Sequence, residues 1–352
     1  MTTPVRHIPS LDGLRAISFL LVFAAHAGLE SFVPGGFGVT IFFFLSGFLI
    51  TTLLRGEFEK NAAISLRHFW LRRILRILPP FYLVLALSIL LSLAVDPPAT
   101  LVPAAVLAQA LQYTNYWIIG HGYWGQPSGT GVYWSLAVEE HFYLAFPWFF
   151  IGLQRMKAAA RTQAFILWGL CALILAWRLV LVFHDHAPTL RTYLASDTRI
   201  DSILFGCALA VWRNPVLDAV ALNDRRWKGV YLPAAVLLLA CCLLVRGDAF
   251  RETFRYSLQG AALTVLFIGA IRYNRWPVFA WLNSRVLVFI GLLSYSLYLV
   301  HLAVILRIAH ALPGVGQVAQ GCISLAIAVA LAWLIYITVE KPCARLRRKL
   351  TD

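Results

Sequence analysis

The chain has 352 residues, of which 60% are hydrophobic and only 13% are charged. Soluble globular domains have about 25% charged residues, so this composition excludes a soluble enzyme and indicates a polytopic membrane protein. The net charge of +14 comes mostly from arginine. We attribute much of it to the usual excess of basic residues in cytoplasmic loops, and not to nucleic-acid binding.

The first apolar stretch, from about Leu14, is predicted to form a helix that carries Arg15 and His26 into or alongside a membrane. Eleven positions separate these two residues, which is about 16 Å along a helix axis. An ionisable side chain inside lipid costs roughly 2.5 kcal/mol or more, so His26 is a candidate functional residue. The alternative is that His26 only lies at the level of the lipid headgroups.

The chain contains eleven apolar runs, at residues 14–30, 37–54, 77–95, 101–119, 132–153, 163–184, 200–213, 229–246, 257–272, 286–309 and 315–338. Clusters of Lys and Arg lie at residues 55–76, 155–161, 213–228, 272–275 and 341–349. All of these clusters face the cytoplasm if run 101–119 does not cross the membrane. That run contains several polar residues and suits a re-entrant segment shielded by protein. We therefore predict an all-α, polytopic transmembrane helix bundle of ten spans with both termini cytoplasmic.

Two outer stretches are unusual in composition. Loop 246–256 breaks the charge pattern, because Arg246, Arg251 and Arg255 are only partly offset by Asp248 and Glu252. The second stretch contains aromatic residues that would suit a carbohydrate ring, namely Trp117, Tyr123, Trp124 and Tyr133. We favour the alternative that they anchor the protein at the membrane interface. The six cysteines have no C-x-x-C or metal-ligand spacing and are interpreted as small core residues.

The run 132–153 carries Glu139, Glu140 and His141 within its first turns. Adjacent carboxylates inside an apolar segment are hard to explain by packing, and we expect them at the same depth as His26. A histidine beside a carboxylate is the usual arrangement of a general base. The alternatives are a structural ion pair of either glutamate with an arginine, or a metal site. We disfavour a metal because no H-E-x-x-H spacing occurs.

Several segments, in order along the chain, carry the motifs of a known family. They are Asp12-Gly13-Leu14-Arg15 leading to His26, FFLSGFLI at 43–50, RRILRI at 72–77, WSLAVEEHFYL at 134–144, RIDSILFG at 199–206 and SYSLYLVH at 294–301. With these motifs the chain resembles the acyltransferase 3 family, integral-membrane O-acyltransferases that modify bacterial surface polysaccharides, peptidoglycan and some antibiotics. The resemblance covers nearly the whole chain. His141 stands where the family usually has Gln.

The resemblance implies that an acyl group, commonly acetyl, passes from cytoplasmic acyl-CoA to a hydroxyl presented on the outer side. CoA carries several phosphates, and arginine pairs with phosphate bidentately. We expect Arg73 and Arg76, with Arg72, to hold the acetyl-CoA donor, and Arg15 to line the same channel. Anchoring of a basic loop would by itself explain Arg72.

The expected mechanism has His26 remove the proton of the acceptor hydroxyl while Glu139 orients or charges its ring. A covalent acyl-enzyme on Ser46, Ser135 or His26 is the alternative. Residues expected to contact substrate are Trp134, Ser135, Glu140, Tyr143, Asp201, Tyr298 and His301. Each of two of these residues has an alternative that we weigh equally with substrate contact. For Asp201 it is a structural ion pair, and for His301 it is a buried, satisfied side chain.

Some family members carry a C-terminal esterase-like domain with a Gly-Asp-Ser motif, whereas Gly247-Asp248 is followed here by Ala249. We therefore predict one integral-membrane domain over residues 1–352, located in the bacterial inner membrane. The expected acceptor is a glycan or a lipid-linked sugar, and the chain acts alone, as a homo-oligomer or with a separate partner protein. A transporter or flippase for acyl groups or lipid-linked sugars is the alternative, which the lack of a visible repeat disfavours.

Overall fold

The computed structural model describes residues 7–95, 101–219 and 223–351, and every regular element within these ranges is a helix. Eight helical segments are long and apolar enough to cross a membrane. They are α1 with the π-helical turn η1 (Pro9–Leu29), α2 (Gly35–Asn61), α3 (Leu66–Val95), α7 (Ala160–Phe183), α11 to α12 (Asp224–Leu244), α14 (Phe254–Arg272), α16 (Arg285–Ala311) and α17 to α18 (Gln317–Leu350). The prediction of an all-α polytopic bundle is confirmed.

The two other predicted spans also form helices, although they differ from the eight. Helix α6 (Trp134–Arg155) has 22 residues and carries the two adjacent glutamates. Helix α10 (Asp201–Val211) has 11 residues, and at 1.5 Å per residue it extends only about 16 Å, half of a bilayer core. The run 101–119 is divided between α4 (Pro103–Ala110) and α5 (Thr114–His121), each of which is too short to cross.

Short elements connect the long helices or form parts of the long segments. The connecting elements are α8 (Thr189–Leu194), α9 (Ser196–Arg199), α13 (Asp248–Glu252), α15 (Pro277–Ala280) and the turns Gly131–Tyr133 and Trp281–Asn283. Within the segment Asp224–Leu244 lie α11 (Asp224–Arg226) and Trp227–Tyr231, and Tyr336–Glu340 joins α17 to the last helix, α18 (Lys341–Thr351). Only Ile200 separates α9 from α10, so the 200–213 run begins with a turn between two helices.

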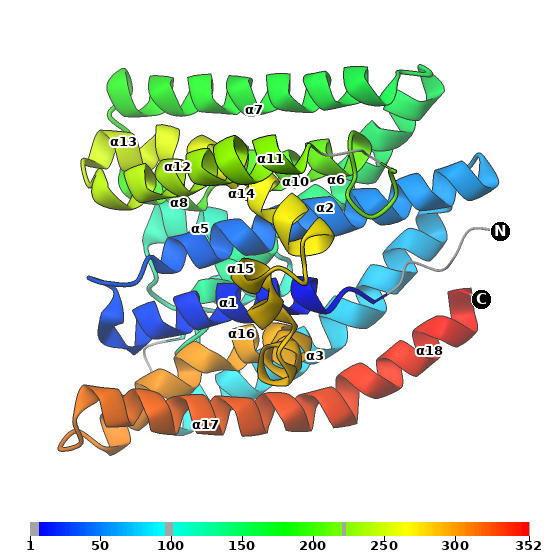
Figure 1. Ribbon diagram of the computed structural model, residues 1–352. Coiled ribbons are helices and arrows are strands. Elements are labelled where there is room, and N and C mark those ends of the chain that lie inside the picture. Colours follow the sequence, from blue (N-terminus) through cyan, green and yellow to red (C-terminus); the bar gives the residue numbers. More distant parts are fainter. Residues whose placement is uncertain (1–6, 96–100, 220–222, 352) are drawn as a thin grey trace.

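The long helices pack as a series of neighbours across the bundle. Helix α7 packs on α10, α10 on α2, α2 on α1, α1 on α16 and α16 on α17, so that α7 and α17 lie at opposite edges (Figure 1). Helices α12 and α14 pack on each other beside this series. Helices α1, α2, α10 and α16 therefore form the centre of the bundle.

Glycines allow α2 and α10 to cross at very short distance. A Cβ at Gly206 would lie 2.0 Å from the carbonyl oxygen of Phe44, and one at Gly47 would lie 2.0 Å from that of Ile203. Only glycine permits two helix backbones to meet so closely. The short helix α10 is thus held against α2 by backbone contact, with Phe44 also packed on Phe267 of α14 at 4.4 Å between ring centroids.

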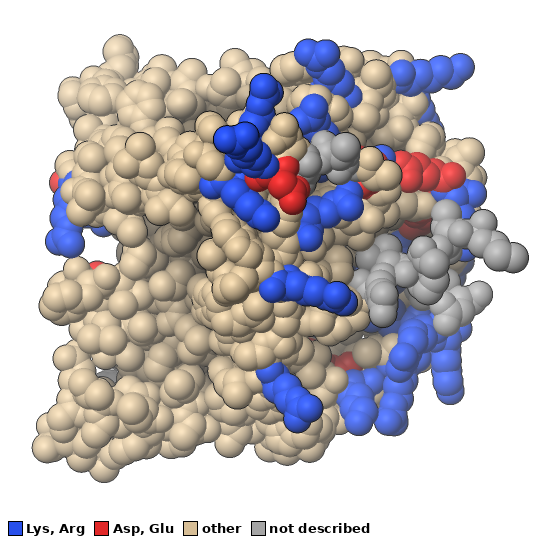
Figure 2. Space-filling model, viewed as in Figure 1, with Lys and Arg blue, Asp and Glu red and all other residues tan. Residues whose placement is uncertain are grey.

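The two ends of the bundle differ in charge. We call the end with the C-terminal part of α2, the beginning of α3 and α18 the basic end. Lys and Arg side chains gather toward it, whereas the half of the visible face toward α13 and the α16–α17 turn is nearly free of charge (Figures 1 and 2).

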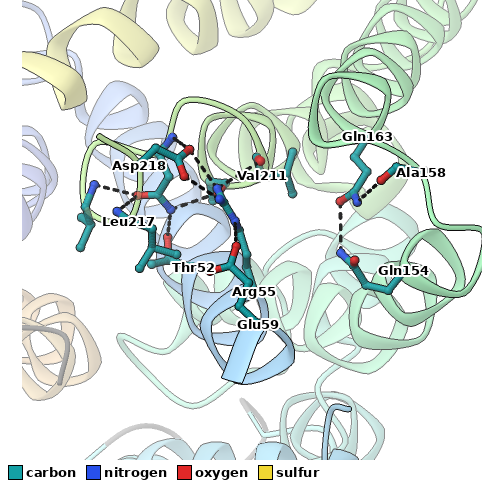
Figure 3. A network of polar contacts seen from close by, with 12 residues as sticks. Thr52, Arg55, Glu59, Gln154, Ala158, Gln163, Val211, Leu217 and Asp218 are labelled. Atoms are coloured by element: carbon teal, nitrogen blue, oxygen red, sulfur yellow. Dashed lines mark hydrogen bonds and ion pairs between the residues drawn. The ribbon is translucent and has the colours of Figure 1, made fainter. Parts of the chain in front are cut away.

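Arginine also stabilises the polypeptide at the basic end. Arg55 of α2 bonds to Asp218 Oδ1 at 2.5 Å, to Glu59 at 2.7 Å and to the carbonyl oxygen of Val211 at 3.2 Å, as Figure 3 shows. This network joins the end of α2 to the loop that follows α10, so part of the positive charge here serves the fold.

Candidate active site

Two cavities enter the bundle. The arginine cavity, about 100 Å³ in volume, is lined by Arg15, Arg73 and Arg76 together with Glu139 and Glu140. The histidine cavity is much larger, about 860 Å³, and is lined by His26 among many others. Val39 and Tyr298 line both cavities. The two cavities therefore approach each other at the side chains of these two residues.

The arginine cavity is lined by residues of five helices, α1, α2, α3, α6 and α16, and three of these carry its charged side chains. Arg15 comes from α1, Arg73 and Arg76 from α3, and the glutamates from α6. Arg15 Nη1 donates a hydrogen bond to Asp12 Oδ1 at 3.0 Å. The Arg73 guanidinium lies 5.6 Å from the ring centroid of Tyr143, close enough for a cation–π interaction. The predicted association of these three arginines is thus present in the structure.

Glu139 is held inside the arginine cavity by two hydroxyls. Ser46 Oγ donates to Glu139 Oε1 at 2.9 Å, and Tyr143 Oη donates to Oε2 at 3.1 Å. The structure does not bring Glu139 and His26 together, because Glu139 lines one cavity and His26 the other. Position along a helix gives depth only approximately, and His26 lies in a π-helical turn that changes its direction.

The partner of His26 is His301 of α16. His26 Nδ1 and His301 Nε2 lie 3.0 Å apart, and the two rings stack with centroids 5.2 Å apart. On its other side, His301 Nδ1 lies 2.8 Å from the carbonyl oxygen of Tyr298. A carbonyl can only accept, so His301 Nδ1 carries the proton and Nε2 of the neutral ring accepts.

This hydrogen-bond series also assigns the proton of neutral His26. Because His301 Nε2 accepts, His26 Nδ1 donates, and His26 Nε2 is left with its lone pair. His301 itself is fully buried and is absent from the lining of both cavities. Of the two alternatives for His301 the structure has the buried, hydrogen-bonded side chain next to His26, and its contact with substrate stays a prediction.

The other predicted substrate residues divide between the two cavities. Trp134 lines the histidine cavity, whereas Ser135, Glu140 and Tyr143 line the arginine cavity. Ser135 Oγ lies 2.7 Å from the hydroxyl of Tyr298, the residue that lines both.

Two predicted residues lie elsewhere. Arg72 forms an ion pair with Glu57 at 2.8 Å and is absent from the lining of the arginine cavity, so the structure does not group it with Arg15, Arg73 and Arg76. Asp201 pairs with Arg178 at 2.7 Å, and both side chains are fully buried. Of the two alternatives for Asp201 the structure has the ion pair, since a carboxylate taken out of water requires a charged partner.

Sequence reasoning did not select the residues of the wall opposite His26. Arg255, Tyr256 and Tyr193 line the histidine cavity, and Arg199 lies behind the same wall. The signals for two of them were the excess of arginine in loop 246–256, which contains Arg255, and the motif at 199–206, which begins with Arg199. Within the described residues no group of three or more His, Cys, Asp or Glu side chains is arranged to hold a metal ion.

Comparison with known proteins identifies the group to which the chain is related. The sequence model of the acyltransferase 3 family, described as an acyltransferase domain, matches residues 8–337. The chain belongs to this family. No solved structure gives a significant match.

Among curated proteins, this acyltransferase 3 chain is 33% identical over 314 residues to the peptidoglycan O-acetyltransferase OatA of Listeria monocytogenes. That match covers 85% of this chain and 50% of OatA. The chain is also 32% identical to YrhL of Bacillus subtilis, which is provisionally named a peptidoglycan O-acetyltransferase. This match covers 96% of this chain and 55% of YrhL. The chain therefore spans about half the length of these relatives.

Proposed function

We propose that this chain is a membrane O-acyltransferase that moves an acyl group, acetyl in the first instance, from acyl-CoA in the arginine cavity to a hydroxyl in the histidine cavity. The observation that carries the proposal is that the two cavities share Val39 and Tyr298. A donor in one cavity and an acceptor in the other would thus be separated by only a few side chains. The acceptor is a glycan, because the relatives named above are peptidoglycan O-acetyltransferases.

The arginine cavity suits the donor because its charge and width fit a CoA thioester. Arg73 and Arg76 provide planar, permanently charged forks for phosphate, and Arg15 lies deeper on α1. A cavity of about 100 Å³ has room for the acetyl thioester end of the donor, but not for the nucleotide. The nucleotide would therefore remain at the basic end, which by the distribution of positive charge is the cytoplasmic end.

In the proposed step the acceptor oxygen bonds to the thioester carbon and the carbon–sulfur bond breaks. His26 Nε2 takes the hydroxyl proton as the oxygen attacks, and the proton is returned to the CoA thiolate, which leaves as the thiol. Ester and free thiol are the only products, so no further reactant is needed. Glu139 lies on the donor side, where its carboxylate accepts hydrogen bonds from the hydroxyls of Ser46 and Tyr143 and so orients them.

The test is acetyl transfer by the purified protein in detergent, with acetyl-CoA as donor and a panel of sugars and glycan fragments as acceptors. We expect ester product with the wild type and none above background with His26→Ala. His121→Ala is the matched control, because His121 is an exposed histidine outside both cavities. Full transfer by His26→Ala would refute the role of His26, and acetyl-CoA binding without transfer to any acceptor would refute the enzyme assignment.

A further inference from the structure

The histidine cavity carries positive charge at the end of the bundle where basic side chains are otherwise scarce. Its charged lining residues are Arg246, Arg251 and Arg255 against Glu30 and Glu252. Basic residues are disfavoured in outer loops of membrane proteins, so three in one cavity wall require a local explanation. Arg251 lies 3.7 Å from the exposed Asp248, whereas Arg246 has no ion-pair partner among the described residues.

Arg255 has unused hydrogen-bonding capacity inside this wall. Its Nη2 donates to the hydroxyl of Tyr256 at 3.1 Å, and its Nε is buried without a partner. Glu252 Oε1 forms an ion pair with Arg255 Nη2 at 3.9 Å, which is beyond hydrogen-bond distance, and Glu252 Oε2 accepts a 2.6 Å bond from Thr192 Oγ1. The guanidinium is therefore positioned in the lining of the cavity but only partly satisfied.

A second cation lies directly behind the same wall. Arg199 is fully buried, and its Nε and Nη1 have no hydrogen-bond partner. The two carboxylates nearest in sequence pair with other arginines, Asp197 with Arg191 and Asp201 with Arg178. A buried charge without a counter-ion destabilises the folded protein. An anion bound close to Arg199 would offset part of this cost.

Arg199 is held by aromatic rings that face the cavity. Its guanidinium lies 3.9 Å from the ring centroid of Tyr256, 5.2 Å from that of Tyr193 and 5.9 Å from that of Trp134. All three rings also line the histidine cavity. The wall therefore presents aromatic surface of the kind on which sugar rings stack, backed by a permanent positive charge and continued by Arg255.

We propose that the histidine cavity binds a sugar that carries an anionic group, a carboxylate or a phosphate, with that group on Arg255 and Arg246 and a hydroxyl toward His26. The inference rests on the proposed function, which it deepens by naming the charge of the acceptor. Arginine is suited to both anions because its fork pairs with two oxygens at once.

The experiment measures equilibrium binding without donor, so that it does not depend on catalysis. The purified protein is placed in nanodiscs of phosphatidylcholine and titrated with three probes: N-acetylglucosamine, N-acetylmuramic acid and N-acetylglucosamine 1-phosphate. One charge-assisted bond contributes roughly 1.5–3 kcal/mol, so we expect at least one anionic probe to bind roughly 10- to 100-fold more tightly than the neutral sugar. Equal affinity for all three would overturn the proposal.

Variants locate the effect. Arg246→Gln and Arg255→Gln are each expected to remove most of the preference for the anionic probe while affinity for the neutral sugar is unchanged. Arg246 is exposed, so its replacement leaves the packing intact. Arg225→Gln removes one charge from the exposed loop helix α11 and is the control for net charge. The proposal would be contradicted if Arg255→Gln lowered the affinity for all three probes equally and Arg246→Gln had no effect on any of them.

Two further arms separate the remaining possibilities. In nanodiscs of phosphatidylglycerol, loss of the preference would show that lipid headgroups occupy the arginines, which overturns a sugar-borne anion. His26→Ala is expected to retain the full preference. If wild-type protein transfers no acetyl group but the preference for anionic sugars persists, the proposed function fails and the binding inference stands.

Discussion

The histidine that the sequence placed beside a carboxylate is instead oriented by a second histidine. A ring that donates through Nδ1 to His301 presents Nε2 as the base, and this geometry needs no buried negative charge. His301 is thus a positioning residue for His26. The arrangement uses the Tyr298 carbonyl as its anchor, and Tyr298 itself lies between the two cavities.

We expect His301→Leu to lower kcat for acetyl transfer by roughly 100-fold or more with little change in KM, because the His26 ring loses its fixed tautomer and orientation. His301→Gln should restore part of the loss, since an amide oxygen can accept from His26 Nδ1–H. The measurement is steady-state kinetics across pH, in which His301→Leu should also shift the acidic limb. Equal activity of the two variants would show that His301 serves packing alone.

Ser46 is the residue that distinguishes direct transfer from an acyl-enzyme. Its hydroxyl donates a hydrogen bond to Glu139 within the arginine cavity, and an activated serine nucleophile would have the same pairing with a base. Direct transfer predicts that Ser46→Ala remains active, with a loss of roughly tenfold or less from the disturbed Glu139 site. Intact-protein mass spectrometry after acetyl-CoA alone should show no adduct in the wild type. A wild-type adduct absent from Ser46→Ala would establish the covalent route.

At the scale of elements, the short helix α10 depends on its crossing with α2. An added methyl group at Gly206 would meet the Phe44 carbonyl oxygen at 2.0 Å, so one of the two backbones must move. We expect Gly206→Ala to destabilise the folded protein by about 1–3 kcal/mol, the usual cost of overpacking.

Thermal unfolding of the purified protein in detergent measures this effect. Gly169→Ala in α7 is the matched control, since nothing lies within 4 Å of the added methyl group. Helix propensity makes it neutral or stabilising by up to about 1 kcal/mol. A Gly206→Ala protein as heat-stable as the control would mean that the α2–α10 crossing relaxes without cost.

Elements that depend on local composition were predictable, and those that depend on distant contacts were not. The eight apolar spans follow from hydropathy, and the break within 101–119 follows from its polar residues. The His26–His301 pair joins positions 275 residues apart, and no spacing rule connects them. The predicted Glu139–His26 pairing is not present for the same reason: each residue was predicted to be buried, but its partner is set by helix packing.

Over the whole molecule, charge and cavities together give a direction for the reaction. Lys and Arg gather at the basic end (Figure 2), and the arginine cavity is lined by residues from the adjoining α3. Helix α13, whose Arg251 and Glu252 line the histidine cavity, lies at the opposite end (Figure 1). If the positive charge faces the cytoplasm, donor and acceptor approach from opposite sides of one membrane.

We therefore expect a cysteine at position 248 to react with a membrane-impermeant maleimide in intact cells, and one at position 349 to react only after permeabilisation. Asp248 is largely exposed, and Lys349 lies in α18 at the basic end. Both substitutions are made on a Cys322→Ser background, because Cys322 is the exposed native thiol among the described residues. Labelling of position 349 in intact cells would invert the orientation. The arginine cavity would then face away from the cytoplasm, and acyl-CoA could not be its ligand.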